Sequence, residues 1–526
     1  MLVTEKIREK DEAVLIVSTQ KTSGKKVIHA HGCFDVLHYG HLRFLEAARD
    51  LGDFLVVSVT SAEFVNKGPG RPLFDNAQRC YQLACLASVD LVFINPEADA
   101  CNLLKELKPD LAVRGSEYRD SDADITGKID EETEAIESVG GDMVFLDTPV
   151  FSSTSLVNSD NLHLPQEIAL YKAQLKNART LEKTSELLDS ASESSVMIVG
   201  DLIIDEYIFS NVLGTVSKHS AISASYKNNR VMGGGSLAIA KHIANFVKQV
   251  DYLARVGQKS TALNEVIFDQ LQGNIDLKLL QEENYHSVTK TRYIASGYSN
   301  PLSGKMQNRT ENTDNRLFEI SHLPEPIDEL TETRLMQLIK DNVSSSDILV
   351  VSDFGHGLIT EKVIDQFSRM DIFMALNVQT NSSNFGFNLV TKYPRADFIC
   401  IDEVEARLAL GERNKDIDFV AKEILSRIEC SSMMITRGKQ GLTYYRDGQR
   451  VEAPALTQTV VDAVGAGDAV FAGAALCAFH QADMETTALV ASVMGMLGTK
   501  IVGNSRSIEA HEVLANVKGF LKTAAS

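Results

Sequence analysis

The chain has 526 residues, of which 44% are hydrophobic and 23% are charged, and its formal net charge is −19. This length and hydrophobic content suffice for more than one packed core and exclude a disordered chain. The acidic excess argues against nucleic acid or an anionic membrane as a partner.

The first residues are charged and lack the apolar core of a signal peptide, and no run of about eighteen apolar residues occurs in the chain. The seven cysteines form an odd set without a CxxC pair, as expected for reduced thiols. We therefore expect a cytoplasmic protein. Residues 1–26 are interpreted as an N-terminal extension.

Residues 27–157 alternate apolar, strand-like runs with helix-like stretches. That alternation predicts a doubly wound parallel sheet and a first α/β domain. The strand-like runs after the first strand are residues 55–60, 91–94, 111–113 and 143–146.

A pair of histidines, His38 and His41, follows the first strand and leads into a helical apolar pattern at Leu42, Leu45 and Ala48. The pair should therefore open a helix, where free N–H groups and the positive end of the macrodipole favour an anion. Such a site can bind a triphosphate and stabilise the charge that grows as pyrophosphate leaves. On their own, two histidines at this spacing also fit a surface feature or half of a zinc site.

Further matches follow this pair in order, and together they resemble the signature of the cytidylyltransferase-like nucleotidyltransferases. They are the run ending in Gly32 and Phe34, the basic stretch 67–72, the helix start 76–79, the turn 108–115 and the Ser-Thr stretch 151–156. The resemblance implies that His38 and His41 are catalytic. It also implies that nucleotide or phosphate is bound by Gly32, Phe34, Lys67, Arg71, Arg114, Ser153 and Thr154. Glycerol-phosphate enzymes of that family have an arginine just ahead of the Ser-Thr motif, whereas residues 148–151 contain none.

Residues 158–195 have no strand signal and become Ser-rich at 190–195. One helical stripe runs through Ile168, Tyr171, Leu175, Ala178, Leu181 and Leu188. We expect a helical linker that packs on the domain after it, with packing on the first domain or pairing across a dimer as alternatives.

Residues 196–526 read as a second parallel α/β domain with buried strands near 196–199, 348–352, 398–401 and 433–436. Toward its end, Gly465 and Gly467 permit a tight turn before the apolar helical stretch 469–479. The amides of Gly465, Ala466 and Gly467 would bind a transferring phosphate, and Asp468 would accept a hydroxyl proton. Glycine-rich turns also precede helices in many α/β proteins without this role.

The order of matches in this half resembles the ribokinase-like (PfkB) sugar kinases. The matches are Gly200 to Asp205, the glycines 233–235, the stretch 402–405, the turn 436–441 and Asp462 at the head of the terminal turn. The resemblance implies that Asp468 is the base, that Glu405 lies near magnesium and that Asp205, Gly234 and Gly235 bind sugar. It assigns nucleotide contacts to Thr436, Gly438 and Gly441, and a small β lid to the insertions near 207–230 and 293–318. The segment 297–304, with Lys290, Arg292 and Arg309 near it, is interpreted as a loop over the sugar site or as a hairpin tip. Two positions depart from the family pattern, Ala238 and Asp402.

Both domain types occur together in the bifunctional heptose kinase–adenylyltransferases, which this chain resembles with the domain order reversed. The resemblance implies ATP and Mg²⁺, with ATP or CTP as nucleotidyl donor, small sugar phosphates as substrates, an ADP-heptose-like product and a homodimer or higher oligomer. One alternative is a CDP-glycerol or CDP-ethanolamine type transferase fused to an unrelated sugar kinase. Another is that one domain is catalytically silent and acts as a nucleotide-binding scaffold.

Overall fold

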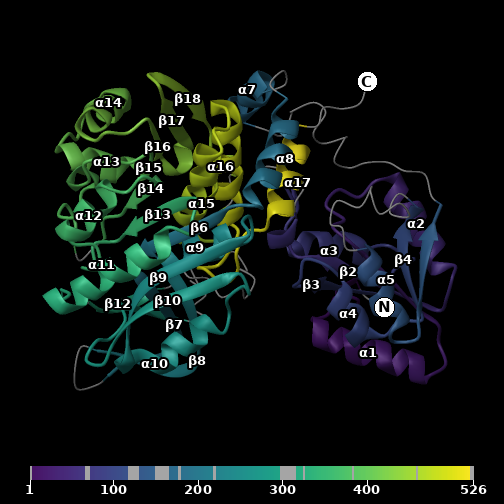
Figure 1. Cartoon of the computed structure of the whole chain (residues 1–526). Helices are drawn as coiled ribbons and strands as arrows, with labels where there is room; N and C mark the ends of the chain where they lie inside the picture. Colours follow the sequence, from purple (N-terminus) through teal and green to yellow (C-terminus); the bar gives the residue numbers. More distant parts are fainter. Residues whose placement is uncertain are drawn as a thin grey trace. The chain divides into compact units, whose positions relative to one another are not determined.

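The structure, a computed structural model, describes residues 3–65, 71–116, 129–147, 165–175, 179–216, 221–295, 316–323, 326–381, 384–457 and 460–521. The chain divides into two compact units. The first comprises Met1–Lys172 with Leu514–Ser526, and the second comprises Ala173–Val513. Figure 1 labels their helices and strands.

The first unit contains a five-stranded parallel sheet in the order β3-β2-β1-β4-β5. The strand order reverses between β1 and β4, and in open α/β sheets the crevice at that point is the usual ligand site. The doubly wound sheet expected from the sequence is confirmed. Its strands are β1 (Val27–Gly32), β2 (Phe54–Thr60), β3 (Leu91–Asn95), β4 (Leu111–Gly115) and β5 (Asp142–Leu146).

Helices cover both faces of this sheet, because its strands carry apolar side chains on both faces. On one face, Ile28 and Leu55 pack with Leu45 of α2 and Leu83 of α3. On the other face, Val27, Phe54 and Val56 pack with Val17 of α1 and Leu103 of α4. The helices are α1 (Lys10–Thr22), α2 (Tyr39–Arg49), α3 (Asn76–Ala84), α4 (Cys101–Leu107) and α5 (Ile129–Glu137).

Two helices cross the division between the units, α7 (Gln166–Leu175) and α17 (Ala510–Leu521). A third, α8 (Thr180–Ala191), lies wholly in the second unit and packs on α16 (Met484–Gly498). An ion pair of 3.2 Å between Lys183 and Asp483 joins α8 to the start of α16. The linker expected at residues 158–195 therefore contains the helices α7 and α8 in its described part.

The second unit is built on a nine-stranded sheet in the order β10-β9-β6-β13-β14-β15-β16-β17-β18. Its strands are β6 (Ser195–Gly200), β9 (Gln249–Gly257), β10 (Ile275–Glu282), β13 (Ile348–Asp353), β14 (Phe373–Val378), β15 (Phe398–Asp402), β16 (Ser432–Thr436), β17 (Leu442–Arg446) and β18 (Gln449–Ala453). The strands from β10 to β16 are parallel, as predicted.

The edge of this sheet departs from a wholly parallel arrangement, because β17 and β18 run antiparallel to their neighbours. Short turns cause this difference, since a parallel connection requires a crossover of a dozen or more residues. The turn between β17 and β18 contains Asp447 at φ 50° and Gly448 at φ 75°, the left-handed pair typical of a tight hairpin.

Helices also cover both faces of the second sheet. One face packs against α11 (Glu329–Val343), α12 (Glu361–Ser368), α13 (Glu403–Leu410) and α14 (Ile417–Arg427). Strands β14, β15 and β16 also contact α15 (Ala466–Phe479), which contacts α16 and α9 (Ser236–Ala244) as well. Every residue of α15 from Asp468 to Ala478 is buried, so this helix can be apolar all round.

A separate four-stranded sheet in the order β12-β11-β7-β8 forms the small lid expected from the sequence. Its strands are β7 (Leu202–Thr215), β8 (Ile222–Gly235), β11 (Thr289–Ala295) and β12 (Arg316–His322). Several large apolar side chains of this sheet are exposed, among them Leu213, Tyr226 and Phe318. The lid loop expected at 297–304 lies outside the described residues, and the oligomeric state stays a prediction.

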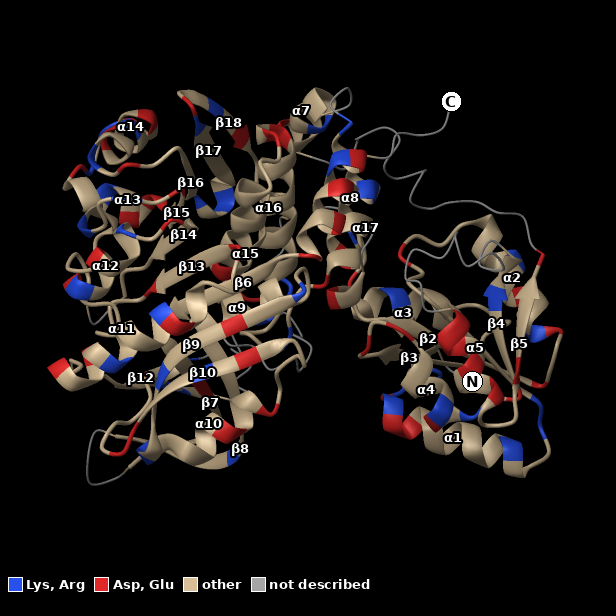
Figure 2. Ribbon diagram, in the orientation of Figure 1, with Lys and Arg blue, Asp and Glu red and all other residues tan. Residues whose placement is uncertain are grey.

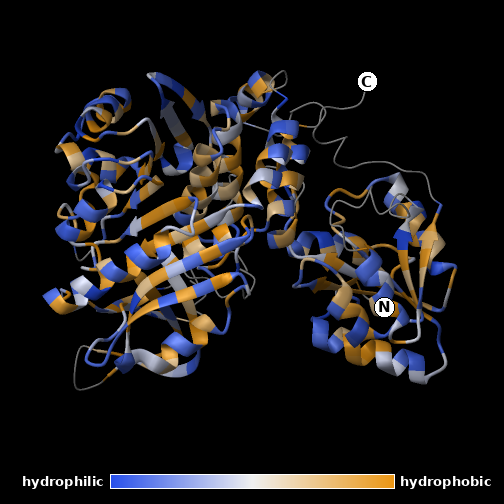
Figure 3. Cartoon of the chain, in the orientation of Figure 1, coloured by the Kyte–Doolittle hydropathy of each residue, from blue (hydrophilic) through white to orange (hydrophobic). Residues whose placement is uncertain are grey.

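Among the described residues, the remaining short elements are α10 (Thr261–Phe268) and the 3₁₀ turns η1 (Val3–Glu5), η2 (Ala62–Phe64), η5 (Gln258–Ser260), η6 (Val390–Lys392) and η7 (Gly438–Gln440). The strands of the two large sheets are rich in hydrophobic residues, and the surface helices alternate hydrophobic with hydrophilic residues (Figure 3). Acidic and basic residues are interspersed over the helices and loops of both units (Figure 2). Among the described helices, none combines the length and apolar character needed to cross a membrane.

Candidate functional sites

In the first unit, the histidine pair lies at the start of α2, as the sequence predicted. His38 is the N-cap residue, and its Nδ1 accepts a hydrogen bond of 3.4 Å from the backbone N–H of His41. The two imidazole rings stack with centroids 3.9 Å apart and an interplanar angle of 18°. Both rings therefore lie at the positive end of the helix dipole, where an anion is favoured.

Phe34 and Gly32 shape the turn that leads to this helix. The Phe34 ring contacts the His41 ring edge-on, with the ring centroids 5.4 Å apart. The backbone of Phe34 has φ 45°. A Cβ atom added at Gly32 would lie 3.1 Å from the Phe34 ring, so a side chain there would crowd it. Both residues were predicted to contact nucleotide, and the geometry shows that they position the aromatic ring beside His41.

Arg71, predicted to bind phosphate, forms a fully buried ion pair with Asp35. The same carboxylate accepts hydrogen bonds from the backbone N–H groups of Leu73 (2.6 Å) and Phe74 (3.1 Å). Asp35 therefore fixes the chain between β2 and α3 to the end of β1. The sequence motifs assigned Asp35 no role, because its partners lie more than thirty residues away along the chain.

Arg114, also predicted to bind phosphate, lies near the end of β4 and forms several hydrogen bonds. One of its Nη atoms donates to the carbonyl of His31 at 2.6 Å, and its Nε donates to Glu132 of α5 at 3.0 Å. Glu132 also accepts a 3.0 Å hydrogen bond from the backbone of Ala100. These contacts join β1, β4 and α5, so Arg114 has a structural role whether or not it meets a nucleotide.

Two histidines of β1, the buried His29 and the partly buried His31, were not singled out from the sequence. Nδ1 of His31 and Nε2 of His29 lie 2.7 and 2.8 Å from the hydroxyl of Ser58. Burial, assisted by the positive charge of Arg114, lowers the pKa of His29 to about 3 and lowers that of His31 well below its usual value. Both imidazoles are therefore neutral at physiological pH.

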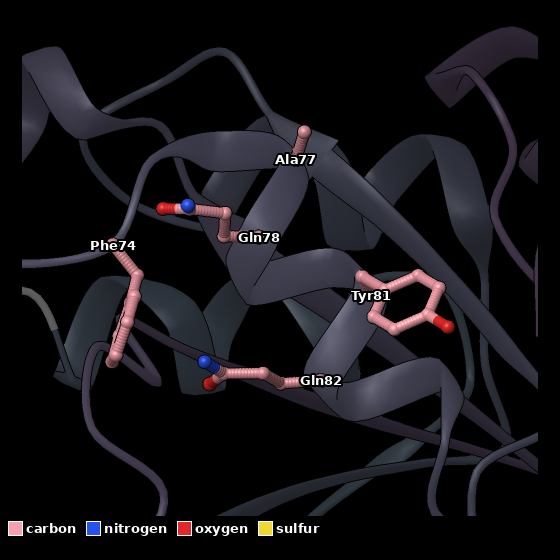
Figure 4. Close-up of a pocket in the computed structure, with 5 residues that line it drawn as sticks. All are labelled: Phe74, Ala77, Gln78, Tyr81 and Gln82. Carbon is pink, nitrogen blue, oxygen red and sulfur yellow. The ribbon is translucent and has the colours of Figure 1, made fainter.

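The remaining predicted residues of this site, Lys67, Ser153 and Thr154, lie outside the described residues. A pocket of about 410 Å³ on the same unit is lined by Phe74 and by Ala77, Gln78, Tyr81 and Gln82 of α3 (Figure 4). None of these five side chains belongs to the predicted site.

In the second unit, the predicted base Asp468 lies in the first turn of α15. Its carboxylate accepts a 2.9 Å hydrogen bond from the amide of Gln379, which follows β14. Burial raises the pKa of Asp468 to about 7, with the bond from Gln379 acting in the opposite direction. A carboxylate with such a pKa can accept a proton near neutral pH. Gln379 carried no sequence signal of its own.

The glycine turn before Asp468 has the predicted geometry. Gly465 is the N-cap of α15 with φ 80°, a conformation that favours glycine. A Cβ atom added at Gly467 would meet no atom within 4 Å, so this side of the helix start is open. Asp462 stabilises the turn, because its carboxylate accepts hydrogen bonds from the backbone N–H groups of Val464 (3.1 Å) and Gly503 (2.8 Å).

Glu405, predicted to lie near magnesium, is in the first turn of α13 and forms a capping box with Asp402. Its carboxylate also accepts from the backbone N–H of Thr380 at 2.9 Å. Burial, reinforced by Asp402, raises the pKa of Glu405 to about 8. A nearby cation would relieve the cost of burying this negative charge.

The described residues contain no group of three or more His, Cys, Asp or Glu side chains able to hold a metal ion. Magnesium is commonly bound through one or two carboxylates together with substrate phosphates and water. The donor set around Glu405 fits magnesium of that kind and does not fit a cage made of protein ligands alone.

Asp205, predicted to bind sugar, lies on β7 of the lid and forms a buried ion pair with Arg292 of β11. A Cβ atom added at Gly234 would lie 2.1 Å from Oδ2 of Asp205, so only glycine leaves room for this carboxylate. Gly235 has φ 58°, and a Cβ atom there would lie 2.7 Å from the carbonyl of Asp201. The sequence placed Arg292 near the lid loop and did not foresee its ion pair.

The turn predicted to hold a nucleotide follows Thr436 at the end of β16. Gly438 and Gly441 have φ 55° and 89°. A Cβ atom at Gly441 would lie 2.0 Å from the carbonyl of Ala453, so this position requires glycine. Arg437, directly before Gly438, forms a 3.0 Å ion pair with Glu403 of α13.

A buried carboxylate pair, Asp201 and Asp353, lies at the ends of β6 and β13, and neither residue was assigned a role from the sequence although Asp201 falls within a matched motif. Asp201 accepts from the backbone N–H groups of Phe354 (2.9 Å) and His356 (3.1 Å). Asp353 accepts from the hydroxyl of Tyr393 at 2.7 Å. Burial and the neighbouring Asp353 raise the pKa of Asp201 to about 7. The strands that carry this pair are adjacent in the sheet although about 150 residues separate them.

In comparison with known proteins, two family models match separate stretches of the chain. Residues 29–159 match the cytidylyltransferase-like model, and residues 308–510 match the pfkB family carbohydrate kinase model. The match to the cytidylyltransferase-like model therefore precedes the match to the pfkB model along the chain.

Each of the curated relatives considered matches about a quarter of the chain. The bifunctional protein HldE of Geotalea uraniireducens is 40% identical over 138 residues, which is 26% of this chain and 27% of that protein. The bifunctional protein HldE of Campylobacter jejuni subsp. doylei is 38% identical over 130 residues, which is 24% of this chain and 28% of that protein. The matched stretch therefore spans little more than a quarter of the length of these relatives.

Solved structures resemble a larger part of the chain. Phosphofructokinase-2 from Escherichia coli in complex with substrates and products aligns with 61% of this chain and 97% of its own, at 12% identity and a TM-score of 0.48. Ribokinase of Arabidopsis thaliana, complexed with ribose and ATP, aligns with 63% of this chain and 100% of its own, at 14% identity and a TM-score of 0.45.

Proposed function

We propose that this chain, in which a cytidylyltransferase-like domain precedes a pfkB family carbohydrate kinase domain, is a bifunctional enzyme that makes a nucleotide-activated sugar. The kinase half would phosphorylate a sugar or sugar phosphate with ATP. The other half would transfer a nucleotidyl group from ATP or CTP to a sugar phosphate and release pyrophosphate. The single observation that carries this proposal is that each unit presents an anion-favouring helix start with acid–base or imidazole side chains in its first turn.

In the nucleotidyltransferase half, the sugar phosphate would attack the α-phosphate of the nucleotide, and the bond to the pyrophosphate oxygen would break. Negative charge then grows on the pyrophosphate and on the equatorial oxygens. His38 and His41 would donate hydrogen bonds to these oxygens from the start of α2. Lys67, Arg71, Arg114, Ser153 and Thr154 remain proposed phosphate contacts, although the first, fourth and fifth lie outside the described residues and the two arginines already bind carboxylates.

In the kinase half, the Asp468 carboxylate would take the proton of a sugar hydroxyl as its oxygen attacks the γ-phosphate of ATP. The amides of Gly465, Ala466 and Gly467 would stabilise the transferring group. Magnesium, when bound, would neutralise charge on the ATP phosphates. Glu405 would hold it from the start of α13, and Thr436, Gly438 and Gly441 would contact the nucleotide.

The resemblance of the sequence motifs to the bifunctional heptose kinase–adenylyltransferases favours a heptose-like sugar and an ADP-heptose-like product. A direct test is mass spectrometry of the products formed with Mg²⁺ from a panel of sugars and sugar phosphates, each with ATP or CTP. A nucleoside-diphosphate sugar from heptose 1-phosphate would support the transferase, and a bisphosphate from heptose 7-phosphate would support the kinase. Products from glycerol phosphate or ethanolamine phosphate alone would point to the CDP-alcohol alternative. Nucleotide binding without turnover in one half would point to a scaffold.

The change Glu405→Gln should raise the Mg²⁺ concentration needed for half-maximal kinase activity by about tenfold, because a neutral amide attracts a divalent cation less strongly than a carboxylate does. Titration of Mg²⁺ in the kinase assay measures this. The exposed Glu429→Gln is the matched control and should leave the curve unchanged. An unaltered Mg²⁺ curve for Glu405→Gln would refute the magnesium role.

The change Gly234→Ala should raise the sugar KM of the kinase by at least about tenfold, because the new methyl group would displace the Asp205 carboxylate. Nucleotidyl transfer should be unaffected. Gly273→Ala is the control, since a Cβ atom there meets nothing within 4 Å. A normal sugar KM in a folded Gly234→Ala variant would show that Asp205 does not bind sugar.

A further inference from the structure

A buried asparagine of the second unit, Asn504, lies beside residues of the proposed kinase site. Asn504 follows α16, and only 6% of its surface is exposed. Its backbone carbonyl accepts a 3.3 Å hydrogen bond from Nζ of Lys241. Its side-chain amide has no hydrogen-bond partner within the described part of the chain.

The Asn504 side chain lies between two glycine turns that serve different parts of the proposed kinase site. Its Oδ1 atom is 2.3 Å from the position that a Cβ atom would take at Gly465, the N-cap of α15. Its Nδ2 atom is 3.3 Å from the corresponding position at Gly234. Oδ2 of Asp205 lies 2.1 Å from that same Gly234 position. One amide therefore spans the distance from the sugar-side turn to the start of the phosphate-side helix.

A buried amide without partners is costly, and buried polar groups in native proteins are almost always hydrogen-bonded. Neighbouring asparagines follow that rule. Asn245 donates to the Ser507 hydroxyl at 2.8 Å and to the Ile508 carbonyl at 2.9 Å, so it anchors the segment that follows Asn504. Asn504 differs, because no hydrogen bond from its side chain is made within the described residues and neither of its amide atoms is fully buried, so a ligand can bond to it in place of water.

We propose that Asn504 binds the sugar substrate and positions its acceptor hydroxyl between Asp205 and the start of α15. An amide can donate through Nδ2 and accept through Oδ1, which matches a sugar hydroxyl that is both donor and acceptor. Held there, the hydroxyl oxygen faces the helix start that would receive the γ-phosphate. This inference rests on the proposed kinase function and adds a specificity-determining residue that the sequence motifs did not indicate.

The test uses the full chain with ATP, Mg²⁺ and heptose 7-phosphate, or whichever sugar of the panel the wild-type chain phosphorylates. Asn504→Ala should lower kcat/KM for that sugar by about tenfold or more, because a buried hydrogen bond to the ligand is lost. The KM for ATP should stay within about twofold, since the nucleotide turn is separate. Asn504→Asp keeps the size of the side chain and should lose more, because a negative charge would then face the transferring phosphate.

Monodeoxy analogues of the sugar separate a ligand contact from a structural role. The analogue lacking the hydroxyl that Asn504 binds should be a poor substrate for the wild type, and Asn504→Ala should not impair its use further. Asn245→Ala is the matched control, because it loosens the same segment without facing either glycine turn. It should lower the thermal midpoint and leave the discrimination between sugar and analogues unchanged.

The outcomes distinguish this inference from the function beneath it. If the wild type phosphorylates no sugar in the panel, the kinase proposal fails and this inference falls with it. If the wild type is active but folded Asn504 variants use sugar and analogues as the wild type does, Asn504 does not bind the sugar. If Asn245→Ala reproduces the sugar defect, Asn504 acts only through the position of its segment.

Discussion

Asp468→Asn is expected to abolish sugar phosphorylation while leaving nucleotidyl transfer at the wild-type rate. The amide cannot accept the hydroxyl proton, and removal of a general base lowers turnover by about 10²- to 10⁴-fold. ATP binding should persist, because the glycine turn that contacts phosphate is unchanged. Parallel assays of ADP release and pyrophosphate release on one preparation measure the two activities separately.

The same substitution should stabilise the second unit, which separates loss of chemistry from loss of folding. The pKa of the Asp468 carboxyl is raised to about 7 in the folded chain, chiefly by burial. An unfolded Asp titrates near 4, so the folded state binds more protons between about pH 4 and 7. The presence of Asp468 therefore costs increasing stability as pH rises through that window, and the full cost remains above pH 7.

Asparagine carries no such cost, so Asp468→Asn should raise the thermal midpoint by a few degrees at pH 8 and by less at pH 5. Scanning calorimetry at both pH values measures this difference. In the wild type, kinase turnover should rise with pH up to about 7 and then level off, because the base must be deprotonated to act. An active Asp468→Asn variant would exclude Asp468 as the base, whatever its stability.

His41→Ala is expected to reduce nucleotidyl transfer by at least about 10²-fold, because it removes a donor from the point where charge develops. Sugar phosphorylation should be unchanged. The loss should appear mainly in kcat, since the helix start and His38 still bind the ground-state nucleotide. Pyrophosphate release from heptose 1-phosphate with ATP or CTP is the measurement.

A control for this change is Arg43→Ala on the same helix, whose side chain is half exposed and pairs with Glu46. It should leave the rate of transfer within about twofold, as expected for an exposed ion pair. His41 stacks on His38, so folding must be verified by thermal unfolding. If His41→Ala or Asp468→Asn removed both activities from a folded chain, the assignment of one reaction to each unit would be wrong.

The sequence alone was sufficient for features that depend on neighbours along the chain. Helix starts at His38 and Gly465 follow from apolar periodicity and from residues that cap or turn the backbone. The parallel strands follow from short apolar runs between helical patterns. Glycine at 441 and 465 could be assigned to turns because left-handed backbone conformations favour it.

Tertiary structure alone decided which side chains meet across the sheets. The pairs Arg71 with Asp35, Arg114 with Glu132, and Gln379 with Asp468 join different elements, and their partners depend on strand order rather than on spacing. The antiparallel edge strands and the buried Asp201 likewise depend on how the sheet is assembled. Asn504 has no sequence signal at all. Its place between two glycine turns exists only once β8, α15 and the segment after α16 have packed together, because burial and ligand geometry are properties of the packed chain.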